Sequence, residues 1–78
     1  MKKVGIIGFG TIGSQIARSI NAGLLSPARL SFIVDSSLSR VEVAKKSITN
    51  DKPQIFSDPD LLFQSESYKD THIVVESA

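Results

Sequence analysis

The sequence predicts an α/β protein with a parallel β-sheet, and three observations support this prediction. Short apolar runs rich in Val and Ile alternate along the chain with segments whose apolar residues recur at helical spacing. Glycine, proline and acidic residues separate these segments, with no repeat or linker between them. The composition, 41% hydrophobic and 22% charged, is typical of a folded chain rather than a disordered one. The length of 78 residues predicts a single, incomplete domain.

The first strand and the first helix lie at the beginning of the chain. Residues Lys3–Ile7 form a nearly continuous apolar run that ends at a glycine, as expected for a parallel strand covered on both faces. A helix is predicted over Thr11–Ala22, because apolar residues recur there at helical spacing. Gly23 follows, at the position where a helix end favours glycine. The predicted buried stripe of this helix consists of Ile12, Ile16, Ala17 and Ile20.

The second strand and helix have similar signals. Leu30–Val34 is an apolar, β-branched run that stops at Asp35. Ser39 followed three positions later by Glu42 is a capping box, which predicts a helix that ends near Thr49. The residues expected to be buried are Val41, Ala44 and Ile48, and Lys45 and Lys46 lie where the helix dipole favours cations.

The last part of the chain contains two further strands and one further helix. Gln54–Phe56 predicts a short third strand after a polar turn. Asp58 and Pro59 are typical of an N-cap with proline at the first helical position. The side chains of this third helix that are expected to be buried are Leu61, Leu62 and Phe63. Thr71–Val75 predicts the fourth strand.

These elements give the order βαβαβαβ, which requires parallel pairing through right-handed crossovers. A doubly wound, Rossmann-type sheet would have the strand order 3-2-1-4 and would be truncated before strands five and six. The ligand crevice is expected at the carboxyl ends of strands one and four. Strand four would be an exposed apolar edge, so we expect self-association or a missing C-terminal half to cover it.

Charge and composition argue against several classes of protein. Nine basic and eight acidic residues provide no basic stripe for a nucleic acid. The absence of cysteine excludes a disulfide scaffold, a thiolate metal site and a cysteine nucleophile, and one histidine cannot build a metal site. The uncharged stretch at residues 4–16 is too short and too rich in glycine to span a membrane. We therefore expect a cytoplasmic protein without nucleic-acid or membrane partners.

Residues 8–13 read GFGTIG, which matches the G-x-G-x-x-G pattern of dinucleotide-binding loops in its expected place between strand and helix. Gly8 would allow a tight turn, Gly10 would let a diphosphate approach the main chain, and Gly13 would let the helix pack closely on the sheet. Asp35 would accept hydrogen bonds from the adenosine ribose and repel a 2′-phosphate, which favours NAD over NADP. Alternatively, the glycines serve only a tight turn and Asp35 only ends a strand.

Polar residues elsewhere have less specific interpretations. Ser36 could contact the ribose, and Arg40 could stack on the adenine or meet a 2′-phosphate, although their loop also suits a helix cap. His72 begins an apolar strand and is interpreted as a surface or sheet-edge residue rather than a catalytic base. Glu76 ends the fourth strand, where it has either a structural hydrogen-bonding role or a place beside the nicotinamide.

Three segments together carry a family resemblance: residues 3–13 (KVGIIGFGTIG), the strand end at residues 33–35 (IVD), and residues 73–78 (IVVESA). With these segments the chain resembles the amino-terminal NAD(P)-binding part of aspartate dehydrogenases. The resemblance implies that residues 1–78 form a partial Rossmann domain of an oligomeric enzyme that oxidises L-aspartate to iminoaspartate with NAD(P). In that family the catalytic histidine and the substrate domain lie beyond this segment, so the resemblance assigns no catalytic residue here.

The resemblance also implies roles for individual residues. Asp35 would contact the ribose, and Ser36 stands where the family often has an arginine, which leaves the choice between NAD and NADP open. The turn under the nicotinamide ribose would be Ser77 and Ala78. The phosphate loop would consist of Gly8, Gly10, Thr11, Ile12 and Gly13.

Two related enzyme families and two further classes of protein also fit parts of the sequence. Residues 1–20 and the turn at residues 23–27 are similar to pyrroline-5-carboxylate reductases, although the end of strand four does not match their pattern. Homoserine dehydrogenases can have a similar sequence at the end of strand four. The two further classes are a non-catalytic dinucleotide-binding regulatory module and a fragment without a ligand.

Overall fold

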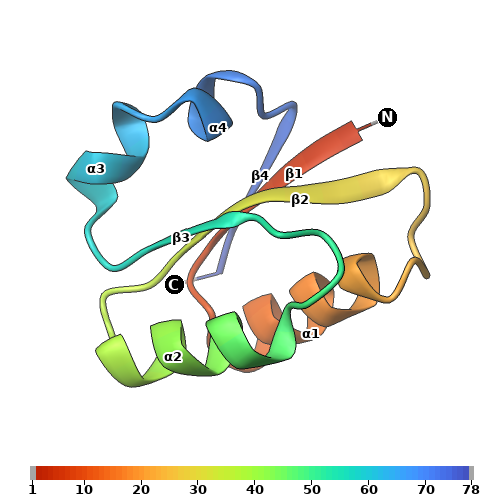
Figure 1. Cartoon of the computed structure of the whole chain (residues 1–78), viewed down its shortest axis with the longest axis horizontal. Coiled ribbons are helices and arrows are strands. Elements are labelled where there is room, and N and C mark those ends of the chain that lie inside the picture. Colours follow the sequence, from red (N-terminus) through yellow and green to blue (C-terminus); the bar gives the residue numbers. More distant parts are fainter. Residues whose placement is uncertain (1, 78) are drawn as a thin grey trace.

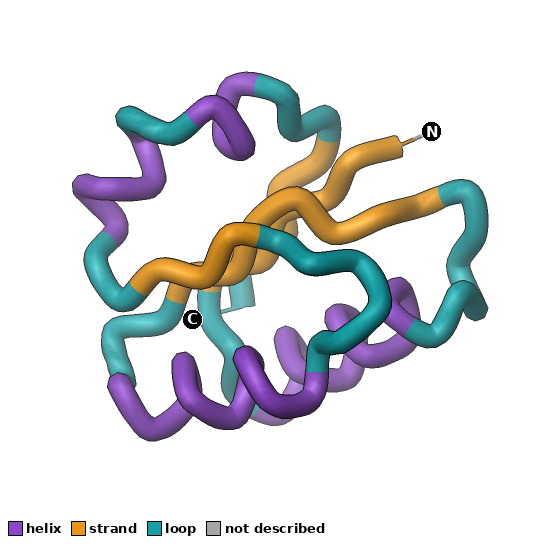
Figure 2. The backbone as a smooth tube through the Cα atoms, viewed as in Figure 1, coloured by secondary structure: helices purple, strands orange, loops and turns teal. Residues whose placement is uncertain are grey.

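The computed structural model describes residues 2–77, which form a parallel sheet with helices on both faces (Figures 1 and 2). The elements in chain order are β1 (Lys2–Ile7), α1 (Thr11–Asn21), β2 (Ala28–Val34), α2 (Leu38–Ser47), β3 (Gln54–Phe56), α3 (Pro59–Phe63), α4 (Glu66–Lys69) and β4 (Ile73–Glu76). The sheet order is β3-β2-β1-β4 and every pairing is parallel. The predicted α/β, Rossmann-like class and the strand order 3-2-1-4 are therefore confirmed. Within residues 2–77, no helix has the length and apolar character needed to cross a bilayer.

Hydrophobic side chains fill the space on both faces of the sheet. Figure 1 shows α1 and α2 on one face and α3 and α4 on the other. On the first face, Ile6 and Ile33 are fully buried in a cluster that includes side chains of α1 and α2. On the second face, Phe32 packs with Leu62 of α3 and with Tyr68 of α4. The two clusters hold the sheet between two layers of helices.

A bulge in the β1–β2 pairing decides which residues of β2 face which helices. The register passes from Val4 opposite Leu30 to Gly5 opposite Phe32, so Ser31 is an extra residue in β2. After the bulge, Phe32 lies against Gly5, where any side chain would collide with the phenyl ring. This contact explains why a glycine interrupts the apolar run of β1.

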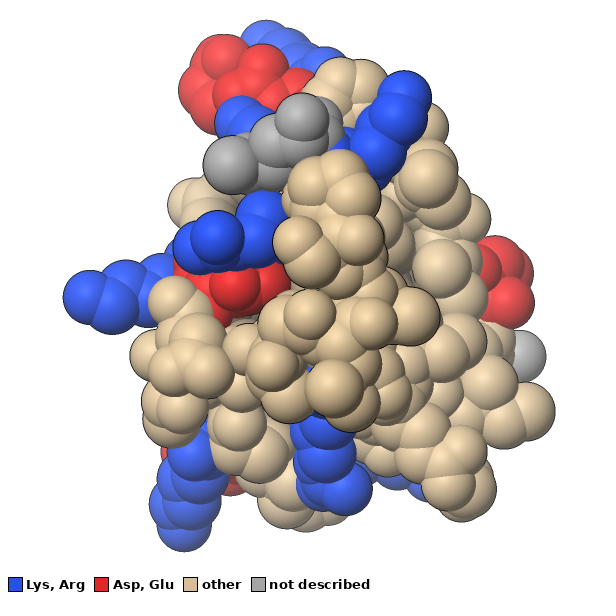
Figure 3. Space-filling model, turned by 90° about the vertical axis from the view of Figure 1, so that its right-hand side faces the viewer, with Lys and Arg blue, Asp and Glu red and all other residues tan. Residues whose placement is uncertain are grey.

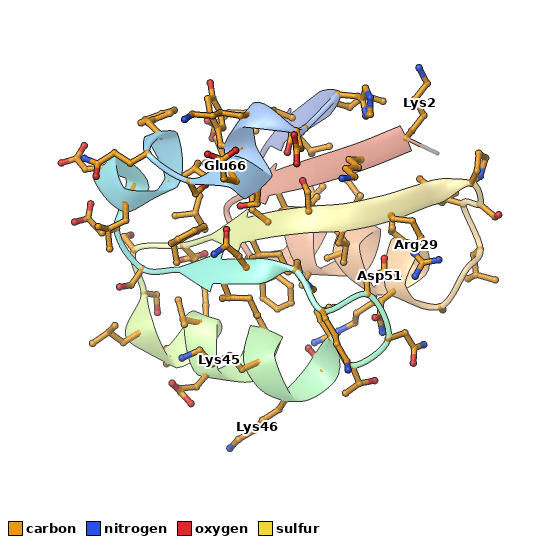
Figure 4. The ribbon with its side chains drawn as sticks, turned by 45° about the horizontal axis from the view of Figure 1, so that its top comes forward. Lys2, Arg29, Lys45, Lys46, Asp51 and Glu66 are labelled. Atoms are coloured by element: carbon orange, nitrogen blue, oxygen red, sulfur yellow. The ribbon has the colours of Figure 1, made fainter. Side chains whose placement is uncertain are left out.

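Polar contacts hold the amino-terminal end of the sheet. The Oδ1 atom of Asn21, at the end of α1, accepts hydrogen bonds from the amides of Asn50 and Asp51 at 2.8 and 3.1 Å. Asp51 also pairs with Arg29 at 2.9 Å, and Figure 4 shows these two side chains close together. The face on the N-terminal side of the molecule carries basic and acidic side chains interspersed with uncharged ones (Figure 3). The hydrogen bonds of Asn21 and the Arg29–Asp51 pair tie α1 and the α2–β3 connection to one end of the sheet.

The N-cap of α2 differs from the prediction. It is Ser37 rather than Ser39, and its Oγ atom accepts a hydrogen bond from the Arg40 amide at 3.4 Å. Ser39 contacts the Ser37 hydroxyl at 2.9 Å, and Glu42 pairs with Lys45 at 3.7 Å instead of closing a capping box. The helix begins earlier because a carboxylate at the end of β2 holds the Ser37 amide, which fixes the extended residue before the first turn.

The buried side of α1 was predicted only in part. Ile12 was expected in the core but is 64% exposed. The buried residues of α1 are Gly13, Ala17 and Ile20. Because Gly13 faces the sheet, Ile12 is displaced from that face by about 100° around the helix. The helix ends as predicted, with Gly23 at φ +82° directly after the C-cap.

The short helix α3 also buries less than predicted. Asp58 is its N-cap and Pro59 its first residue, as expected. Of the three residues expected in the core, only Leu62 is buried, whereas Leu61 and Phe63 are 53% and 52% exposed. A helix of five residues turns only one side to the sheet.

One helix was missed, and several boundaries differ. Helix α4 begins after Ser65, whose Oγ atom accepts a hydrogen bond from the Tyr68 amide at 3.2 Å. The hydroxyl of Thr71 donates to the Ser67 carbonyl at 2.6 Å, which closes the turn after α4 and excludes Thr71 from the strand. β2 begins at Ala28 rather than Leu30, α2 ends at Ser47 rather than near Thr49, and β4 spans Ile73–Glu76 rather than Thr71–Val75.

Candidate functional site

A pocket of about 440 Å³ lies at the carboxyl ends of the strands. The last residue of β1, Ile7, is in register with Val34 of β2 and with Glu76 of β4, so these strands end at the same edge. Six residues that the sequence singled out line this pocket: Gly8, Gly10, Asp35, Ser36, Arg40 and Ser77. Ile7, Val34 and Pro59 complete the lining. The structure therefore gathers at one pocket residues from both ends of the chain.

The glycine loop between β1 and α1 forms one wall of the pocket. Gly8 has φ +97°, in the region that favours glycine, and its amide donates to the Val34 carbonyl at 2.8 Å. A side chain at Gly13 would collide with the Gly8 carbonyl oxygen, so the helix packs against the loop itself. A side chain at Gly10 would meet only Arg40, whose Cζ atom would lie 3.9 Å away. A methyl group at Gly10 would thus fit, in van der Waals contact with the Arg40 guanidinium.

The amino terminus of α1 lies at the same wall. Gly10 is the N-cap and offers no side-chain hydrogen bond, and the first turn contains no acidic residue. The first-turn amides of a helix have no acceptor within the helix, and they concentrate about half a positive charge there. Thr11 lines a neighbouring pocket of about 240 Å³ together with Gly10 and Arg40. Ile12 belongs to neither pocket lining.

Asp35 follows β2 and is the acidic residue of the pocket lining. Its side chain is only 5% exposed. Oδ2 accepts a hydrogen bond from the Phe9 amide at 2.7 Å, and Oδ1 accepts one from the Ser37 amide at 2.8 Å. The Arg40 Nη1 atom lies 3.7 Å from Oδ2. Asp35 therefore joins the glycine loop to the start of α2, a role that the sequence pattern did not suggest.

Ser77 joins the end of β4 to the glycine loop. Its amide donates to the Ile7 carbonyl at 2.9 Å, and its hydroxyl donates to the Gly8 carbonyl at 2.8 Å. The hydroxyl also lies 3.2 Å from the Ile7 carbonyl. Ser77 thus lines the pocket while its side chain is engaged with the loop. Ala78, the other residue predicted for this turn, lies outside the described residues.

His72 and Glu76 lie at opposite ends of β4, His72 directly before the strand and Glu76 at its last residue. His72 is exposed, and its backbone and Nδ1 atom pair with the backbone of Lys3 at 2.8 and 3.0 Å. This contact confirms the sheet-edge interpretation of His72. Glu76 is exposed at the carboxyl end of β4, opposite Ile7. Among the described residues, no group of three or more His, Cys, Asp and Glu side chains could hold a metal ion.

Sequence reasoning missed Pro59 as a residue of the pocket. It predicted Pro59 only as the first residue of a helix. The signal was nevertheless present, because the predicted strand order puts the end of β3 beside the end of β2, and Pro59 follows β3 closely. Residues after adjacent parallel strands meet at one edge of the sheet.

Comparison with known proteins finds three similar proteins, all named L-aspartate dehydrogenase. The protein from Methanosarcina mazei is 37% identical over 84 aligned residues, which cover 100% of this chain and 31% of that protein. Those from Methanosarcina acetivorans and Methanosarcina barkeri are 34% and 32% identical over the same shares. No protein-family model matches the chain. The chain is thus similar over its whole length to L-aspartate dehydrogenases, and it spans 31% of the length of these curated relatives.

Proposed function

We propose that this chain is the NAD(P)-binding portion of an oxidoreductase of the L-aspartate dehydrogenase kind. The observation that carries the proposal is that Gly10, a glycine of the G-x-G-x-x-G pattern, borders a pocket of about 440 Å³ at the carboxyl ends of the strands. Two observations together identify the proposed ligand as a dinucleotide. The glycine pattern is typical of dinucleotide-binding loops, and the similar proteins carry the name of a dehydrogenase.

The residues of the pocket fit the adenosine and diphosphate half of such a cofactor. The diphosphate would approach the main chain at Gly10, which has no side chain of its own and where the positive end of the α1 dipole attracts it. The ribose would lie near Asp35 and Ser36 at the end of β2. Val34 and Pro59 would offer apolar surface to the adenine. The nicotinamide half would extend toward the turn at Ser77.

For the whole enzyme, we propose the oxidation of L-aspartate to iminoaspartate with NAD(P). The bound cofactor would supply the hydride acceptor for that reaction. Residues 1–78 would form a partial Rossmann domain that binds and orients the cofactor, with the catalytic and substrate-binding residues located elsewhere in the enzyme. We assign no catalytic residue within this chain.

Titration of the chain with NADH tests the binding proposal. We expect amide chemical shifts to change in the segments 8–13 and 35–40, which contain the lining residues Gly8, Gly10, Asp35, Ser36 and Arg40, while the distant pair Arg29–Asp51 stays unaffected. NADH fluorescence should also increase as the nicotinamide leaves water. The absence of any shift change at millimolar NADH would refute the proposal.

A further inference from the structure

We propose that Arg40 reads the ribose of the bound nucleotide, and that the pocket prefers an adenosine carrying a 2′-phosphate, as in NADP. The proposal rests on the proposed function, because it specifies the ligand chemistry of the same pocket. It departs from the expectation that Asp35 selects NAD by repelling a 2′-phosphate. Three features of the structure carry it: the orientation of Asp35, the position of Arg40 and the charge of the pocket lining.

The Asp35 carboxylate lines the pocket, but both of its oxygens are engaged by the protein itself. Its side chain is 5% exposed, and each oxygen accepts a hydrogen bond from a backbone amide, one from Phe9 and one from Ser37. These bonds fix the carboxylate between two loops. The two amide donors and the Arg40 guanidinium, 3.7 Å away, offset part of the carboxylate charge, so its repulsion of a 2′-phosphate is weakened.

Arg40 is the charged side chain that faces the pocket. It is 58% exposed, and it lines both the large pocket and the neighbouring one of about 240 Å³. Its Cζ atom would lie 3.9 Å from a Cβ atom at Gly10, which places the guanidinium beside the glycine loop. The Ser37 cap holds the first turn of α2, from which the side chain extends.

The pairing with Asp35 leaves the guanidinium able to bind a phosphate. The Nη1–Oδ2 distance of 3.7 Å is longer than a hydrogen bond, so this contact is an ion pair that does not use the N–H donors. Among the described residues of the pocket lining, Arg40 is the only basic one and Asp35 the only acidic one. Guanidinium groups bind phosphate oxygens through two parallel hydrogen bonds. The exposed hydroxyl of Ser36 adds a donor on the same rim.

Two small ligands test the proposal directly: adenosine 5′-monophosphate, and adenosine 2′,5′-bisphosphate, which differs from it only by the 2′-phosphate. Their dissociation constants would be measured by calorimetry for the unaltered chain, Arg40→Gln, Arg40→Lys and Lys46→Gln. Lys46→Gln is the matched control, because it removes the same charge from the other end of α2, where Figure 4 shows Lys46 directed away from the body of the protein.

The unaltered chain should bind the bisphosphate about tenfold more tightly than the monophosphate, as expected for a phosphate held by an arginine. Arg40→Gln should abolish this difference while changing monophosphate affinity less than about twofold, and Arg40→Lys should retain part of it. Lys46→Gln should preserve the full ratio. Rising salt should reduce the advantage of the bisphosphate.

Two results would overturn the inference while leaving the proposed function intact. The first is equal affinity of the unaltered chain for both ligands. The second is an equal loss of affinity for both ligands in Arg40→Gln, which would mean that Arg40 stacks on the adenine instead. If neither ligand binds, and NADH does not bind either, the proposed function fails together with this inference.

Discussion

Gly10 and Gly13 belong to one sequence pattern but have different surroundings. Gly10 faces the open pocket in extended backbone that alanine can adopt (φ −80°, ψ −155°), whereas Gly13 packs against the Gly8 carbonyl oxygen. We expect Gly13→Ala to destabilise the fold by about 1 to 3 kcal/mol through overpacking. Gly10→Ala should cost at most about 1 kcal/mol, as a less favourable N-cap. Urea unfolding of both variants measures the difference.

The same two variants separate folding from binding. A methyl group at Gly10 would project into the pocket, so Gly10→Ala should weaken binding of adenosine 5′-monophosphate about tenfold while the protein stays folded. If Gly10→Ala were as destabilising as Gly13→Ala, or if it bound the nucleotide normally, the assignment of Gly10 to the pocket wall would be wrong.

Asp35 contributes to stability independently of any ligand. Asparagine has nearly the same size, but its NH₂ group would face the amide of Phe9 or of Ser37, so one of the two hydrogen bonds would be lost and a buried donor left unpaired. We expect Asp35→Asn to lower the free energy of unfolding by about 1 to 3 kcal/mol. Denaturation of the ligand-free protein measures this loss. A change below about 0.5 kcal/mol would show that the carboxylate does not connect the two loops.

At the scale of the elements, the start of α2 gives a sharp test. Ser37 accepts a hydrogen bond from the Arg40 amide, whereas Ser39 contacts only the Ser37 hydroxyl among the described partners. Ser37→Ala should therefore destabilise the protein by about 1 kcal/mol, the usual cost of a lost N-cap. Ser39→Ala, the matched control, should cost clearly less. Thermal unfolding followed by circular dichroism would compare the two, and a larger loss in Ser39→Ala would restore the capping box predicted from the sequence.

Apart from α4, the order of the elements could be predicted from the sequence, because it depends on local patterns and on a general rule of chain topology. Apolar runs such as Leu30–Val34 mark buried strands, and right-handed crossovers then give the order 3-2-1-4. The cap of α2 could not be predicted in this way. It depends on Asp35 holding the Ser37 amide, and the carboxylate is itself oriented by Phe9, 26 residues earlier in the chain.

The candidate site shows the same division between local and long-range information. The glycine pattern at residues 8–13 and the acidic residue after β2 identified two walls of the pocket. The direction of the Asp35 side chain, the exposure of Ile12 and the position of Pro59 beside the pocket all depend on packing between distant segments. Such packing has no signature within a short window of sequence.

For the molecule as a whole, the pocket brings together the main connections of the fold. Its lining comes from the ends of β1 and β2, the start of α2, the start of α3 and the residue after β4. Ser77 binds the Gly8 carbonyl, and Asp35 binds the Phe9 and Ser37 amides. A ligand seated there would contact segments that must all be folded at once, so its binding should stabilise the entire chain rather than one loop.

This coupling can be measured as a thermal shift. At a ligand concentration ten times the dissociation constant, binding to the folded state alone adds about 1.4 kcal/mol of stability. For a domain of this size, each kcal/mol corresponds to about 4 to 8 °C, so adenosine 2′,5′-bisphosphate should raise the unfolding temperature by roughly 6 to 11 °C. Gly10→Ala at the same ligand concentration should show a much smaller rise. An equal rise in both proteins would mean that the ligand binds outside the pocket bordered by Gly10, since only a site at that wall is sensitive to the added methyl group.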